Sequence, residues 1–147
     1  MKNASLVDLW KEGRTRFTKL LDAVQESDLP KKNGASPNSA GFLIRHIAEV
    51  ELLFSKNVFG LGEVKIVAKT LIAGKDTGEW TNLDELREIV AYAGEMLEKA
   101  ILIQENWDDI IETKEFGRKS RSEALGRIST HTAYHAGQLA LILKYGR

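Results

Sequence analysis

Cysteine is absent from this chain of 147 residues, and proline is scarce. Without cysteine the protein itself can form no disulfide, can use no thiolate nucleophile and can hold no metal through sulfur. The two prolines, Pro30 and Pro37, lie close together, so long stretches on either side are free of the residue that most strongly breaks helices. These absences direct attention to helical structure and to metal ligands other than sulfur.

The chain also lacks an excess of charge of either sign, since 21 Lys and Arg residues balance 21 Asp and Glu residues. No basic face stands out, so we expect no nucleic-acid partner. No apolar run is long enough to cross a bilayer, and the first residues show no secretion signal, so we expect a cytoplasmic protein without a membrane partner. The length favours one domain spanning residues 1–147.

Hydrophobic residues recur at helical spacing in four segments, which predicts an all-α fold. The predicted helices span about residues 5–25, 39–59, 82–104 and 121–145. A polar residue followed three positions later by an acidic one resembles a capping box at three of their starts, namely Ser5 with Asp8, Asn82 with Glu85 and Ser120 with Glu123. Gly60 and Gly146 are placed to end the second and fourth helices.

Four amphipathic helices of this length predict a four-helix bundle. No segment shows the alternating pattern rich in Val, Ile and Thr that strands favour, so we expect no strand and a plain loop around Trp107 and Phe116. Residues 61–80 are predicted to form a long connection that contains a short helix and leaves room for a crossover. The three tryptophans are expected in the core or an interface.

The three histidines of the chain all fall on apolar stripes that we expect to face inward. His131 and His135 are four residues apart, which on a helix places their Cβ atoms about 5–6 Å apart on one face. Their stripe reads Ile128, His131, His135, Gln138 and Ile142. His46 lies on the corresponding stripe of the second helix, between Leu43 and Val50.

Three imidazoles on two inward faces can hold one divalent metal ion and leave a position open, which is typical of catalytic rather than structural zinc. The alternative is that each histidine is a packed core residue, and on the pattern alone both interpretations stay open. Thr132 stands where a H-E-x-x-H metalloprotease motif needs glutamate. No Glu-x-x-His occurs, so a carboxylate-bridged dinuclear site is also disfavoured.

Two segments resemble motifs of the DinB/YfiT-like metalloenzyme family. Residues 38–51, NSAGFLIRHIAEVE, resemble the second helix of that family, and residues 131–138, HTAYHAGQ, resemble its last-helix motif. The resemblance covers essentially the whole chain. It implies a four-helix bundle of the DinB/YfiT-like type with a long connection between the second and third helices. It also implies a divalent metal ion, nickel or zinc, held by His46, His131 and His135, and a homodimer.

Characterised members of that family include transferases and isomerases that use low-molecular-weight thiols. The resemblance therefore implies a metal-dependent enzyme, a thiol S-transferase or a hydrolase-like enzyme, acting on a small-molecule substrate. Because the chain has no cysteine, any thiol must come from a cosubstrate. The alternatives are a non-catalytic metal-binding bundle that senses, stores or is stabilised by metal, and a helical interaction module whose histidines only pack.

Helical spacing places further residues beside these ligands. Glu49, three residues after His46, could orient a ligand, accept a proton or join the metal ligands, although a solvated helix glutamate is its more common role. Gln138, three residues after His135 on the inward stripe, is predicted to hydrogen-bond a ligand from behind. Ala136 stands where many family members have arginine, and we expect this difference to remove an anion contact near the site.

Overall fold

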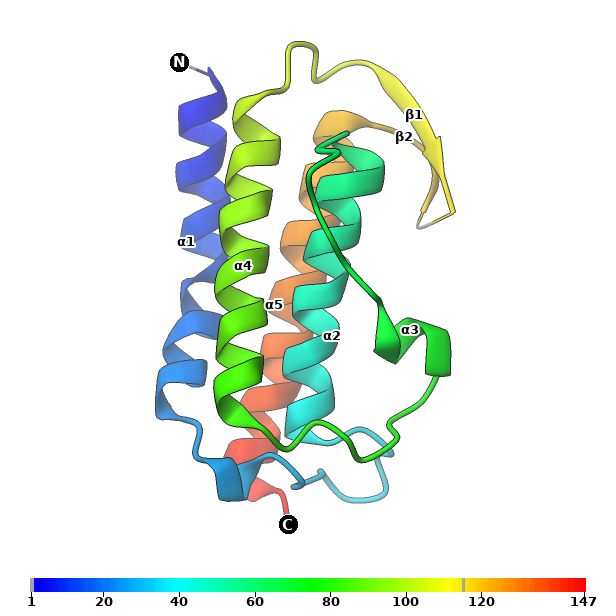
Figure 1. Cartoon of the computed structure of the whole chain (residues 1–147). Coiled ribbons are helices and arrows are strands. Elements are labelled where there is room, and N and C mark those ends of the chain that lie inside the picture. The colour runs from blue at the N-terminus through cyan, green and yellow to red at the C-terminus, as the bar shows by residue number, and fades with distance from the viewer. Residues whose placement is uncertain (1, 115) are drawn as a thin grey trace.

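The structure is a computed structural model of the whole chain, and it describes residues 2–114 and 116–147. Most of these residues are helical. Four long helices lie side by side, and they are α1 (Lys2–Ala23), α2 (Ala40–Leu53), α4 (Leu83–Leu102) and α5 (Arg121–Tyr145) (Figure 1). Within the described part of the chain, no helix combines the length and the apolar character needed to cross a membrane.

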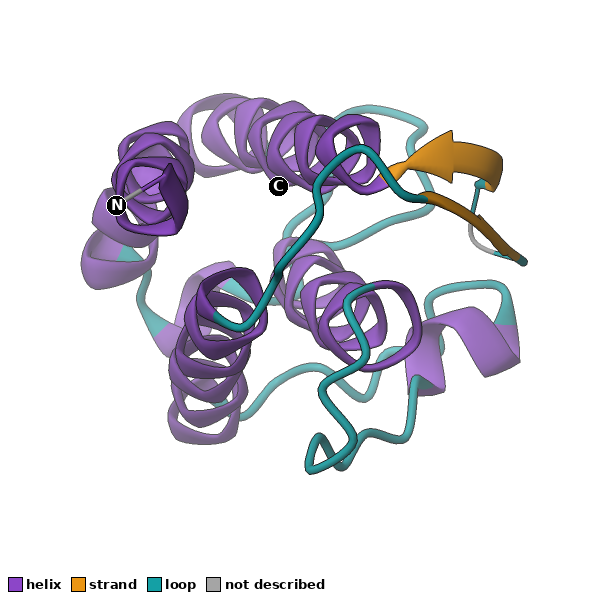
Figure 2. Cartoon of the chain, turned by 90° about the horizontal axis from the view of Figure 1, so that it is seen from above, coloured by secondary structure: helices purple, strands orange, loops and turns teal. Residues whose placement is uncertain are grey.

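Each long helix packs against two others, in the cyclic order α1, α4, α2, α5 (Figure 2). α1 and α5 run in one direction, whereas α2 and α4 run in the other (Figure 1). Because α2 and α4 are parallel, residues 59–82 must return along the outside of α2 before α4 begins. This returning segment contains the short helix α3 (Lys69–Ala73).

Side-chain caps decide where three of the long helices begin. The N-cap side chain accepts a hydrogen bond from a backbone N–H three residues on, in the pairs Ser39 with Phe42, Asn82 with Glu85 and Ser120 with Glu123. These bonds satisfy donors that the first turn of a helix leaves free. The predicted starts of α2, α4 and α5 are therefore confirmed. The predicted start of α1 at Ser5 is wrong, because the helix already begins at Lys2.

α2 continues into a π-helical turn, Phe54–Val58. The wider turn is closed by the N–H of Phe59, which donates to the carbonyl oxygen of Phe54 at 2.9 Å. Gly60 then leaves the helix with a φ of 75°, a conformation that favours glycine. Turns of this kind occur often at functional sites, and Phe54 is part of the site described below.

Residues 110–113 and 117–120 form a pair of strands where the sequence predicted a loop. Strand β1 (Ile110–Thr113) pairs antiparallel with β2 (Gly117–Ser120). The prediction of a purely α fold is wrong here, because each strand has only four residues and such short strands show too little alternation to be recognised. Gly117, with a φ of 79°, begins the second strand.

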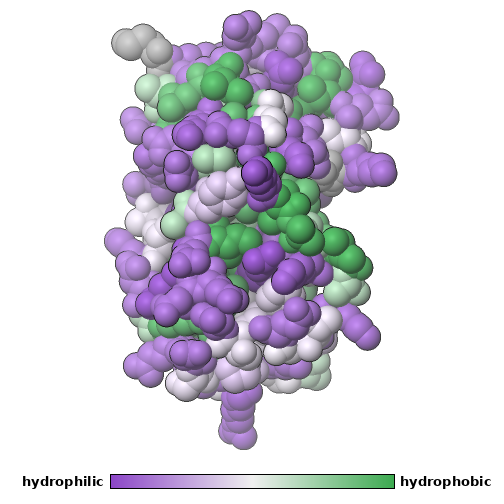
Figure 3. Space-filling view, in the orientation of Figure 1, coloured by the Kyte–Doolittle hydropathy of each residue, from purple (hydrophilic) through white to green (hydrophobic). Residues whose placement is uncertain are grey.

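The hairpin and α3 lie on the same side of the molecule, outside the four long helices (Figures 1 and 2). Figure 3 shows that the surface is hollowed between them, with hydrophobic residues beside the hollow. Exposed apolar side chains in and next to α3 are Val67, Leu71 and Ile72. The other half of the connection is covered, since Leu61 and Val64 are buried.

A buried ion pair crosses the core. Arg14 of α1 donates to Glu51 of α2 through Nε and Nη2, at 2.9 Å each. Nη2 of Arg14 also donates to the carbonyl oxygen of Val90 in α4, at 3.0 Å. The hydroxyl of Thr132 in α5 donates to the same Glu51 carboxylate, at 3.2 Å. Gly94 leaves room for the guanidinium, since a Cβ there would lie 2.8 Å from Nη1 of Arg14. One polar network thus joins all four long helices.

The returning connection is held against α2 by a close backbone contact. A Cβ at Gly41 would lie only 1.9 Å from the carbonyl oxygen of Trp80, so glycine lets the connection cross α2. Arg45 supports the same approach, because its guanidinium lies 5.6 Å from the centre of the Trp80 ring and donates to the carbonyl oxygen of Val67 at 3.1 Å. Trp80 is buried, as are Trp10 and Trp107, which confirms the core prediction for the tryptophans.

Replacing Gly41 by alanine should destabilise the protein, because the added methyl group would overlap the Trp80 carbonyl oxygen. We expect the free energy of unfolding to fall by about 1–3 kcal/mol, as measured by urea denaturation. Gly126→Ala is the matched control, since a Cβ there meets nothing within 4 Å, and it should be neutral or stabilising by up to about 1 kcal/mol. Equal effects of the two substitutions would show that the connection does not depend on this contact.

Candidate metal centre

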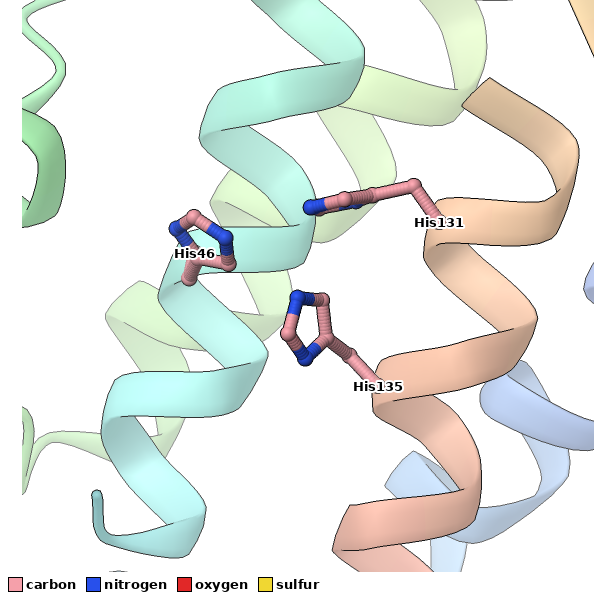
Figure 4. A group of neighbouring side chains, drawn as sticks. All are labelled: His46, His131 and His135. Atoms are coloured by element: carbon pink, nitrogen blue, oxygen red, sulfur yellow. The ribbon is translucent and has the colours of Figure 1, made fainter. Parts of the chain in front are cut away.

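The three histidines meet where α2 faces α5 (Figure 4). One ring nitrogen from each of His46, His131 and His135 can be chosen so that the three atoms lie within 4.8 Å of one another. The ring centroids are 4.5–5.1 Å apart. The structure therefore brings together all three predicted ligands, two from one helix face of α5 and one from α2.

The histidine rings lie at the edge of the contact between the helices and not at its centre. All three are partly buried, whereas Thr132 and Ala136 of α5 are fully covered. The prediction that the α5 stripe faces inward along its whole length is wrong, because Gln138 is exposed. The buried face of α5 is centred one position further along the chain, where Thr132 contacts Glu51. This displacement leaves the imidazoles accessible from one side.

His46 is oriented from behind by a chain of hydrogen bonds. The hydroxyl of Thr70 in α3 lies 3.3 Å from Nδ1 of His46 and donates its hydrogen to the carboxylate of Glu49. Because that hydrogen is already used, the hydroxyl accepts the hydrogen of Nδ1. His46 then carries its proton on Nδ1 and turns the lone pair of Nε2 toward the other two histidines.

Glu49 is completely buried, so the prediction of a solvated glutamate is wrong. Its carboxylate also accepts from the backbone N–H of Thr70 at 2.9 Å and from Nε of Arg45 at 2.5 Å. These bonds commit both of its oxygens. Glu49 therefore acts on His46 through Thr70, and it is not among the residues whose ligand atoms converge.

Gln138 orients His135 through a hydrogen bond at Nδ1, as Thr70 orients His46. Its amide oxygen lies 2.7 Å from Nδ1 of His135, and an amide oxygen can only accept, so the imidazole donates. The proton of His135 is therefore also on Nδ1, and Nε2 is left with its lone pair facing the cluster. The ring of Tyr134 meets His135 edge-on, with centroids 5.3 Å apart, and it is itself exposed at the rim.

His131 has a buried ring nitrogen, Nδ1, that makes no hydrogen bond within the described part of the chain. A buried polar atom without a partner costs roughly 1–3 kcal/mol, so this side chain is not satisfied by packing alone. Burial, followed by electrostatic repulsion from His135, His46 and Arg127, lowers its pKa to about 3. Burial and then His135 lower the pKa of His46 to about 4. Both imidazoles are therefore neutral at pH 7.

These observations fit a divalent metal ion better than they fit packing. Metal ligation requires neutral imidazoles, and a hydrogen bond to the second ring nitrogen is the usual way in which proteins orient them. Two nitrogens bound to one zinc ion are at most about 4.2 Å apart, so the cluster is already near the spacing of a ligand set. Three nitrogen ligands leave at least one coordination position free for a small molecule.

A cavity of about 430 Å³ adjoins His46 and His131. Its walls are largely apolar and include Val50, Leu53 and Phe54 of α2 with its π-helical turn, and Leu71 of α3. A second hollow on the outer side of His131 is bordered by Thr130 and Tyr134. His131 thus borders both hollows, and His46 borders the first.

Ala136 does not belong to this region. It is buried and lines a separate groove with Gly13 and Leu20 of α1. The expectation that alanine at this position removes an anion contact beside the histidines is therefore wrong, because the side chain at 136 faces the groove beside α1.

Thr70 is the site residue that the sequence did not reveal. It lies 24 residues from His46 in a connection without a recognisable pattern, and only the return of this connection along α2 brings the two together. Gln138 could be found, because its distance of three residues from His135 is a local property of the helix.

Comparison with protein families identifies one match, in which the model of the DinB superfamily aligns with residues 9–139. The matched region contains both histidine segments, the whole of α2 and α4, and most of α1 and α5. Comparisons with curated proteins and with solved structures found no match.

The lowered pKa values predict that the metal-free protein loses stability in mild acid. Histidines of the unfolded chain titrate near pH 6.5, so between that pH and about pH 4 the unfolded chain binds more protons than the folded one. The free energy of unfolding must therefore fall as the pH falls through this window. Urea denaturation in the presence of a chelator, repeated between about pH 7 and pH 4.5, measures this decrease in the free energy of unfolding.

The control for this prediction is His131→Gln, which removes the imidazole with the larger shift. Its stability should depend less steeply on pH than that of the unsubstituted protein over the same range. An equal slope for both proteins would contradict the assignment of the acid sensitivity to the histidine cluster.

Proposed function

The chain belongs to the DinB superfamily, and we propose that it is a DinB-type four-helix bundle that binds one divalent metal ion through His46, His131 and His135. We further propose that the bound ion serves a transfer reaction on a small molecule. The observation that carries this proposal is the convergence of three imidazoles, two of them held from behind at Nδ1, beside an open cavity.

A ligand set of three imidazoles suits zinc or nickel. When bound there, either ion would lower the pKa of a coordinated thiol, so that the thiolate is available at neutral pH. The thiol must be a low-molecular-weight cosubstrate, because the chain has no cysteine. In the transfer, sulfur forms a bond to an electrophilic carbon, the leaving group departs with its electron pair, and the thiol proton passes to water.

The residues of the chain orient the metal ligands and form an apolar cavity beside them. Thr70 and Gln138 hold the imidazoles of His46 and His135 at their outer nitrogens. Glu49 fixes Thr70 and is a positioning residue. A small molecule that fills the apolar cavity would displace water from one side of the site, which strengthens electrostatic interactions within it.

The cavity favours an enzyme over a non-catalytic metal-binding bundle. A metal that only fixes the fold needs a closed ligand shell, whereas here His46 and His131 border a cavity of about 430 Å³. The homodimer stays a prediction. It is supported by the exposed apolar residues Val67, Leu71 and Ile72.

Calorimetric titration of the metal-free protein with zinc or nickel should reveal one site per chain. His131→Ala or His135→Ala should abolish nearly all binding, because each leaves only two protein ligands. Gln138→Ala and Thr70→Val should each weaken binding by about 10–100-fold, since they remove the group that orients a ligand.

Thr15→Val is the matched control for the threonine substitution, because the Thr15 hydroxyl donates to the carbonyl oxygen of Lys11 in its own helix, α1, which supplies no residue of the site. It should leave the affinity unchanged, and circular dichroism should show the same helical content in every variant. Unchanged affinity in either α5 histidine variant would mean that the imidazoles pack and do not coordinate.

Turnover is tested by incubating the metal-loaded protein with monochlorobimane and glutathione, bacillithiol or mycothiol. We expect fluorescent conjugate to form with at least one thiol, to disappear in His46→Ala and after chelation, and to return when metal is restored. Equal rates for the unsubstituted protein and His46→Ala would refute the transferase. Tight metal binding without turnover would favour the non-catalytic alternative.

A further inference from the structure

The cavity beside the histidines has two cationic side chains at its rim. Lys114, at the turn of the hairpin, and Arg127, on α5, complete its lining. They come from two different elements and converge on a space whose other walls are apolar or imidazole. No carboxylate of the described residues lines it.

Neither cation is neutralised within residues 2–114 and 116–147. Two other basic residues of the chain do form ion pairs, Lys11 with Glu98 at 2.9 Å and Arg121 with Asp109 at 3.1 Å. Lys114 and Arg127 have no such ion pair and no hydrogen bond there, and both side chains are exposed. Arg127 precedes His131 by four residues, so its guanidinium lies on the same face of α5 as the imidazole.

We propose that this cavity binds a small molecule that combines an apolar body with one anionic group. The apolar body lies against Val50, Leu53 and Leu71, and the anionic group lies between Lys114 and Arg127. One part of this proposal rests on the proposed function, namely that the reacting end of the molecule lies at the histidines.

The physical basis is charge complementarity next to apolar surface. An anion that enters between two unpaired cations gains charge-assisted hydrogen bonds, and a guanidinium can bind a carboxylate or phosphate through two of its N–H groups. A cationic molecule would be repelled by both side chains, and a neutral one would gain only the apolar contacts. The volume is sufficient for a single ring with a short chain, within the range of ordinary small-molecule sites.

The test compares 4-(4-fluorophenyl)butyrate with 4-(4-fluorophenyl)butyramide, two probes with the same body that differ in charge. Fluorine NMR titration of the metal-free protein, in the presence of a chelator, reports their affinities without a contribution from bound metal. We expect the acid to bind about tenfold more tightly than the amide. Arg127→Gln and Lys114→Gln should each reduce this preference several-fold, and the double variant should bring the ratio close to one.

Two control variants separate charge from shape. Arg118→Gln removes the same charge from an exposed residue of β2 that does not line the cavity, and it should leave the preference intact. Leu71→Trp fills the cavity from α3 and should lower the affinity for both probes to the same extent. Equal affinity of acid and amide, absence of binding by both, or a preference that survives in the double variant would each overturn the proposal.

Repeating the titration with zinc distinguishes this proposal from the proposed function. If zinc does not bind but the metal-free protein still prefers the acid, the metal proposal fails and the anion site stands. If zinc binds but the metal-free protein shows no preference, the anion site fails and the metal proposal stands. A preference that arises only with zinc and persists in the double variant would place the carboxylate on the metal and overturn the anion site.

Discussion

The buried ion pair between Arg14 and Glu51 determines how the four long helices fit together. A charge of either sign left alone in the core would be strongly destabilising, so the helices must be aligned such that the guanidinium and the carboxylate meet. The same carboxylate accepts from Thr132, which immediately follows His131 in the chain. The ion pair therefore also fixes how far α5 is shifted along α2, and hence whether the histidines of the two helices lie opposite one another.

α2 carries a second buried carboxylate only two residues away, and the two have different roles. Glu51 points into the core toward α1 and α5, whereas Glu49 points outward, under the returning connection, and binds Thr70 and Arg45. One carboxylate aligns the helices that supply the imidazoles, and the other attaches the short helix that orients one of them. Without the second, Arg45 would still bind the carbonyl oxygen of Val67, but nothing would fix the direction of the Thr70 hydroxyl and hence of the His46 ring.

Local features of the fold could be predicted from the sequence, and features made by distant segments could not. The caps of α2, α4 and α5 and the four-residue spacing of His131 and His135 are each settled within one turn of helix, so the sequence displays them directly. The approach of α2 to α5 was implied only by the family resemblance. The role of Thr70 and the burial of Glu49 both depend on a connection that folds back along α2. The sequence of this connection has no hydrophobic periodicity from which its path could be predicted. The hairpin was missed because its strands are too short for a pattern.

The histidines sit on long helices, but the cavity beside them is walled partly by α3 and the hairpin, which belong to the connections between those helices. Substitutions in the hairpin can therefore change which molecules fit the cavity without altering the ion pair or the imidazoles. This division separates the part of the protein that must stay constant from the part that is free to diverge. It makes the hairpin strands β1 and β2 a natural segment to exchange when the ligand preference of the scaffold is to be redesigned.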